Sequence, residues 1–80
     1  MKTTLLEIID LASSGKWTKA HDRLQNTTHP LGDWIHAVLH REEGDLSNAR
    51  YWYNKSQKEF IEIPLQEEYA MIKKEIEAMS

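Results

Sequence analysis

One pattern of residues occurs twice and limits the folds that this chain can adopt. A glycine, a polar residue, an apolar residue, two polar residues and an alanine occupy positions 15–20 and again 44–49. A large apolar residue, Leu24 or Tyr53, follows each alanine four positions later. Glycine readily takes the left-handed conformation that ends a helix, and alanine lets two helices approach closely. The repeat therefore predicts two helical hairpins, each reversing direction at its glycine.

Apolar residues recur at intervals of three and four along the whole chain, which predicts an all-α fold of about five helices and no sheet. A Thr4–Glu7 capping box marks the first helix start, and Asp45 is a suitable N-cap for the fourth. Each of the other boundaries falls at or near a glycine or a proline. The predicted helices cover about residues 4–14, 17–26, 32–43, 45–63 and 64–79.

The two hairpins resemble tetratricopeptide repeats, which carry a glycine at the turn and a small alanine early in the second helix. The two glycines, Gly15 and Gly44, are 29 residues apart, whereas the usual repeat has about 34 residues. A shorter connection around residues 27–32 accounts for the difference. The resemblance implies a single tetratricopeptide-like domain over residues 1–80, in which the last helix caps the two hairpins.

A more specific resemblance covers roughly residues 15–56. The segment from Trp34 to Tyr53, WIHAVLHREEGDLSNARYWY, is similar to the central motif of a family of small, uncharacterised, mainly bacterial proteins. The upstream positions that also match are Trp17, Ala20, His21 and Gln25. This resemblance implies an α-helical fold and suggests no reaction.

Composition argues against several classes of function. The net charge of −3 and the lack of a basic cluster argue against nucleic-acid binding. The chain has no cysteine, so thiolate metal sites and disulfides are excluded. No apolar run approaches the ~20 residues of a membrane span, and the N-terminus lacks the pattern of a signal peptide. We expect a cytoplasmic protein with no cofactor, no membrane contact and no nucleic-acid partner.

Three histidines are the candidates for a metal site. His36 and His40 are four positions apart, so a helix places both on one face, and His21 approaches them if its helix packs on theirs. Zinc requires a third or fourth ligand. Besides His21, the residues that could supply it are Asp22, Glu7 and Glu43. The alternative, which the sequence favours, is that the imidazoles pack between the helices of a hairpin in a polar network.

Aromatic and cationic side chains suggest a binding groove. Trp34 and Arg41 are seven positions apart and share a helix face, and Tyr51 and Trp52 follow on the next helix. Aromatic residues and arginine dominate the energetics of protein interfaces. These four residues are the candidate groove, and packing in the core or at its edge is the alternative.

These observations lead to two hypotheses. The first is a protein–protein interaction module, because short stacks of hairpins offer exposed surfaces, and its partner is another protein or a second copy in a homodimer. The alternative is a small metal- or ligand-binding protein, or a minor enzyme, that uses His21, His36 and His40. No serine, threonine or lysine has an identifiable activating partner, so no catalytic residue is predicted and an enzyme is not expected.

Overall fold

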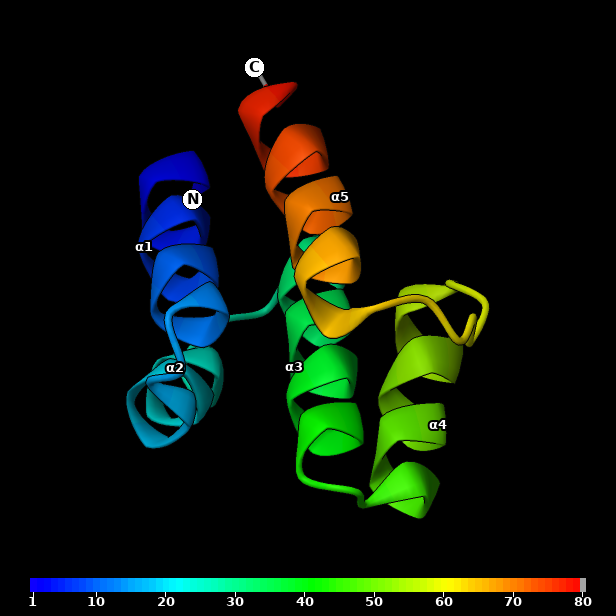
Figure 1. Ribbon diagram of the computed structural model, residues 1–80. Helices are drawn as coiled ribbons and strands as arrows, with labels where there is room; N and C mark the ends of the chain where they lie inside the picture. Colours follow the sequence, from blue (N-terminus) through cyan, green and yellow to red (C-terminus); the bar gives the residue numbers. More distant parts are fainter. Residues whose placement is uncertain (80) are drawn as a thin grey trace.

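A computed structural model describes residues 1–79 and shows an all-α fold, which confirms the predicted class (Figure 1). No strand occurs in this part of the chain. Its five helices are α1 (Lys2–Ser13), α2 (Trp17–Leu24), α3 (Pro30–Glu42), α4 (Leu46–Ser56) and α5 (Leu65–Glu77). None of the helices in residues 1–79 has the length and apolar character needed to cross a bilayer.

Both predicted reversals are formed at the repeated glycines. Gly15 has φ of 81° between α1 and α2, and Gly44 has φ of 85° between α3 and α4. This left-handed conformation strains any residue with a Cβ, which explains the glycine at each turn. The two repeated alanines, Ala20 and Ala49, are fully buried, as expected where two helices approach closely.

Helix α3 is the centre of the molecule. It packs against each of the other four helices, and α5 lies alongside α1 and α3 (Figure 1). The whole segment from Trp34 to His40 is buried, so α3 has no open face over two turns. The core combines this helix with the apolar stripes of α1 and α5, which include Leu5, Ile9 and Ile72. The side chains of α3 are therefore packed by other helices on several sides.

Two helix starts were predicted from capping residues, with different outcomes. Asp45 caps α4 as predicted: its carboxylate accepts a hydrogen bond from the Asn48 backbone N–H at 3.3 Å and another from the Asn48 side chain at 3.0 Å. These bonds hold the pKa of Asp45 below its usual value. The Thr4–Glu7 capping box is wrong, because α1 already begins at Lys2 with Met1 as its uncapped N-cap. Thr4 lies inside the helix.

Helix α4 is shorter than predicted, because it ends at Ser56 rather than near Ile63. Gln57 takes a left-handed conformation with φ of 60°, and the Lys58 N–H donates to the Tyr53 carbonyl at 3.1 Å, as in a Schellman motif. The chain then continues as a non-helical connection up to Pro64. Phe60 turns back so that its ring lies 5.2 Å from that of Tyr53.

Smaller differences concern α2 and α3. Helix α2 ends at Leu24, two residues before the predicted end, and α3 begins at Pro30, two residues before the predicted start. His29 is the N-cap of α3, where its Nδ1 accepts the Leu31 N–H at 3.0 Å. A histidine can replace the usual Ser, Thr, Asp or Asn in this role, which sequence patterns do not reveal.

Candidate metal-binding site

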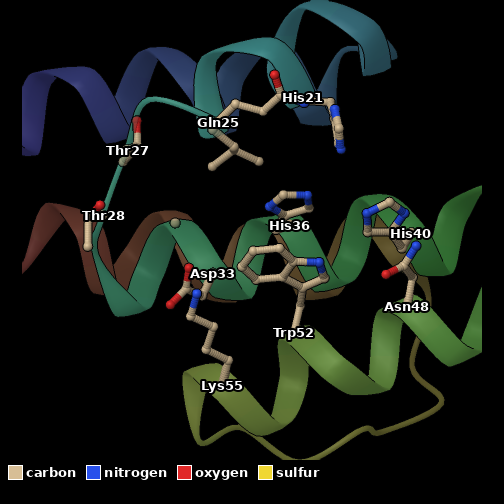
Figure 2. Close-up of a pocket in the computed structure, with 12 residues that line it drawn as sticks. His21, Gln25, Thr27, Thr28, Asp33, His36, His40, Asn48, Trp52 and Lys55 are labelled. Carbon is tan, nitrogen blue, oxygen red and sulfur yellow. The ribbon is translucent and has the colours of Figure 1, made fainter.

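Three imidazoles meet where α2 packs against α3 (Figure 2). His36 and His40 stack with ring centroids 5.0 Å apart, one helical turn from each other. His21 comes from α2 and meets both rings edge-on, at 4.7 Å from His36 and 5.4 Å from His40. The structure therefore brings together the three histidines that the sequence singled out.

Two tryptophans hold the histidine cluster from opposite helices. Trp17 of α2 stacks on His21 at 4.8 Å, and its Nε1 donates to the Leu39 carbonyl of α3 at 2.7 Å. Trp52 of α4 stacks on His36 at 3.9 Å with the rings 9° from parallel. Stacking on an indole restricts the rotation of an imidazole ring, so His21 and His36 are oriented in advance.

Glu43 fixes the tautomer of His40. One oxygen of its carboxylate lies 2.7 Å from His40 Nδ1. Because a carboxylate only accepts hydrogen bonds, Nδ1 carries a proton and donates, so in the neutral imidazole the lone pair is on Nε2. A carboxylate behind a histidine in this way is typical of metal-ligating histidines, since it orients the ring and raises its basicity.

Burial keeps His36 neutral. Removal from water, together with smaller effects of the neighbouring His21, His40 and Lys55, lowers its pKa to about 4. Metal ions bind the neutral imidazole. At pH 7 His36 therefore has a free lone pair and needs to lose no proton before it binds a cation.

This lowered pKa predicts how stability depends on pH. Between pH 6.5 and 4 the unfolded chain binds a proton at His36 that the folded protein does not, so the free energy of unfolding falls as the pH is lowered through this window. Above pH 6.5 His36 is neutral in both states, so this loss of stability is absent. We expect a loss of about 1–2 kcal/mol, reduced from the full shift because water in the adjacent pocket screens the charge.

The measurement is urea denaturation of the metal-free protein at pH 7.5, 5.5 and 4.5. His36→Gln is the control, since carboxylates elsewhere also titrate in acid and the difference between the two proteins isolates His36. If the two proteins lost stability in parallel, the neutral state of His36 would be wrong.

The ligand atoms of the three histidines all lie within 4.8 Å of one another. Three nitrogens bound to one zinc ion at 2.0–2.1 Å in tetrahedral geometry are about 3.3 Å apart. The three nitrogens would have to draw closer together by up to about 1.5 Å to hold one ion. The histidine cluster can therefore offer three protein nitrogens to one ion such as zinc once its side chains adjust.

The other ligands that the sequence suggested are placed elsewhere. Glu7 pairs with Arg23 at 2.7 Å, Asp22 is exposed on α2, and Glu43 binds the back of His40. In residues 1–79 the histidine cluster thus contains no fourth protein ligand. A three-ligand site keeps one coordination position open, as catalytic and ligand-binding zinc sites do.

A pocket of about 590 Å³ adjoins the histidine cluster between α2, α3 and α4. The side chains that line it beyond the cluster are mostly polar. They include Gln25, Thr28, Asp33, Asn48, Trp52 and Lys55. A pocket of this volume has room for a small molecule, and all three histidines form part of its wall.

The four residues of the predicted groove lie in two separate places. Trp34 and Arg41 converge on Glu68, which α5 inserts between them with only 1% of its surface exposed. Trp34 Nε1 donates to this carboxylate at 2.9 Å and Arg41 Nη1 at 2.8 Å. Tyr51 is 58% exposed, and Trp52 stacks on His36 of the histidine cluster.

Glu68 is the centre of a buried polar network. Besides Trp34 and Arg41, the Tyr53 hydroxyl donates to it, at 2.8 and 2.9 Å from the two oxygens. Arg41 also donates to the Ile63 carbonyl. Burial and the bond to Glu68 together raise the pKa of Tyr53. The network joins α3, α4, α5 and the connection before α5, so its role is structural.

The sequence analysis missed Glu68 and the pocket lining. An acid at the start of the last helix is expected from the helix dipole alone, but Glu68 falls three residues after Leu65 and four before Ile72, on the apolar stripe. That position is the signal that could have identified it. The pocket residues have no comparable signal, because they meet only through the packing of α2, α3 and α4 against one another.

Comparisons with known proteins return no relative: no protein-family model, no curated protein and no solved structure matches this chain. The resemblances to tetratricopeptide repeats and to the small bacterial family therefore stay predictions from the sequence. The case for a function depends on the geometry of the histidine cluster.

Proposed function

We propose that this protein binds a divalent transition-metal ion, with zinc as the reference, through His21, His36 and His40. The observation that carries the proposal is the convergence of three imidazoles from two helices at the wall of a pocket. Imidazole nitrogen is a ligand that suits zinc, copper and nickel. This is the second of the two hypotheses from the sequence.

Two features support metal binding over packing alone. His36 and His40 are each 7% exposed, which suits either role. The Glu43 carboxylate behind His40 suits a polar packing network as well as a metal ligand, whereas the third imidazole, which comes from another helix and faces the same polar pocket, favours a ligand set. Carboxylate support, a neutral His36 and indole stacking are the features of a prepared metal ligand set.

Zinc titration by calorimetry tests the proposal. The parent protein is expected to bind one zinc ion, and His36→Ala to bind more than about a hundredfold more weakly, because losing a ligand costs more than losing a supporting hydrogen bond. The matched control is His29→Asn, which removes the fourth histidine while keeping an N-cap side chain for α3. This control should bind zinc as the parent does.

Two results would contradict the proposal. The first is the absence of binding heat in the parent and in His36→Ala alike. The second is equal weakening by His29→Asn and His36→Ala, which would indicate non-specific binding to surface histidines.

The interaction-module hypothesis stays a second prediction. Five large apolar side chains are exposed, and they come from the chain start, α4, the α4–α5 connection and α5. They are Met1, Leu46, Tyr51, Ile61 and Met71. Exposed apolar residues scattered over several elements are normal on a soluble domain, so the metal site has the stronger support.

A further inference from the structure

The pocket beside the histidine cluster has two chemically different ends. At one end are the three imidazoles. At the other, Asp33 is half-buried and the exposed Lys55 holds its ammonium 4.8 Å from the centre of the Trp52 ring. Figure 2 shows Asp33 and Lys55 together at the end away from His40. A ligand in this pocket can therefore reach both a metal ion and a pair of opposite charges.

The two charged groups at the far end are available. In residues 1–79 neither the Asp33 carboxylate nor the Lys55 ammonium takes part in a side-chain hydrogen bond or an ion pair. Burial raises the pKa of Asp33, while the charge of Lys55 lowers it, which places the two groups near each other. One carboxylate and one ammonium side by side are complementary to the ammonium and carboxylate of an α-amino acid.

The charge of the metal-loaded pocket favours a ligand with one net negative charge. The ion adds two positive charges to three neutral imidazoles, and the opposite charges of Asp33 and Lys55 cancel. The negative charge of Glu43 behind His40 offsets one of the two positive charges of the ion. A metal ion is the largest local charge in such a site, so a neutral or cationic ligand is disfavoured there.

From these observations we infer that the metal-loaded protein binds an acidic amino acid. The side-chain carboxylate of the ligand occupies the open coordination position, its α-carboxylate pairs with Lys55, and its α-ammonium pairs with Asp33. An acidic amino acid supplies these three groups and the required net charge of −1. The inference depends on the proposed metal site, because the ion is what binds the side-chain carboxylate of the ligand.

The test is calorimetry on the zinc-loaded protein with three probes. L-Glutamate carries all three groups, glutarate lacks the ammonium, and 4-aminobutyrate lacks the α-carboxylate. L-Glutamate is expected to bind at least about tenfold more tightly than either analogue, the effect of one hydrogen bond to a charged group. L-Aspartate, which is one methylene shorter, measures the reach between the metal and the charged end.

Two variants assign the contacts. Asp33→Asn should bind L-glutamate no more tightly than glutarate. Lys55→Gln should bind L-glutamate no more tightly than 4-aminobutyrate. Both variants should retain the parent's zinc affinity. Lys74→Gln, an exposed lysine of α5, should change neither. If the parent binds zinc but shows no preference for L-glutamate, the amino-acid inference is wrong and the metal site stands. The same holds if the preference survives in both pocket variants. A parent that binds no zinc overturns the metal site as well.

Discussion

Replacing Glu68 with leucine is expected to lower the free energy of unfolding by about 3–5 kcal/mol, because the change removes the buried acceptor of three donors and leaves a largely buried guanidinium without its carboxylate. Arg41, Tyr53 and Trp34 all donate to this carboxylate. Each would keep a buried donor with nothing to accept it. A domain of 80 residues has only about 4–12 kcal/mol of stability in total, so the variant should be close to unfolding.

Thermal and urea denaturation followed by circular dichroism measure this effect. The melting temperature should fall by at least about 12 °C. Glu67→Leu is the matched control, because Glu67 is the exposed neighbour of Glu68 on the same helix and should change stability by less than about 0.5 kcal/mol. A second change, Arg41→Met, should restore part of the loss by removing the unpaired charge. A Glu68→Leu protein within 1 kcal/mol of the parent would show that the network is not formed.

Zinc is expected to stabilise the folded protein by about 4 kcal/mol when its free concentration is a thousand times the Kd. This gain corresponds to a rise in melting temperature of at least about 16 °C. His21 is the ligand from α2, whereas His36 and His40 come from α3, so the ion links the two helices. His21→Ala should therefore lose most of the rise.

The measurement is a melting curve at increasing zinc concentrations for the parent, His21→Ala and His29→Asn. His29→Asn should show the same rise as the parent, since His29 caps α3 and lies outside the cluster. Equal rises in all three proteins would mean that zinc acts somewhere else. An unchanged melting temperature in the parent would contradict the site directly.

Local signals in the sequence predicted most of the fold. Gly15 and Gly44 require positive φ, and Ala20 and Ala49 fit only where helices touch, so the reversals were readable without a structure. The end of α4 was not. Phe60 continues the helical stripe of Ala49 and Tyr53 in sequence, but a left-handed Gln57 ends the helix and Phe60 packs from a non-helical segment instead.

The candidate site was partly predictable, because part of it also depends on local spacing in the sequence. His36 and His40 share a face by spacing alone, and the sequence named His21 as the third member. Which nitrogen is free, and what supports it, depends on tertiary contacts: Glu43 behind His40 and Trp52 on His36. The pocket depends on the packing of α2, α3 and α4 against one another, which no local pattern encodes.

X-ray absorption spectroscopy of the protein loaded with one equivalent of zinc tests the central claim most directly. The three-histidine site predicts three imidazole nitrogens at 2.0–2.1 Å and one further light-atom ligand in the open position. A spectrum with one imidazole or none, and a shell made up mainly of oxygen, would contradict it.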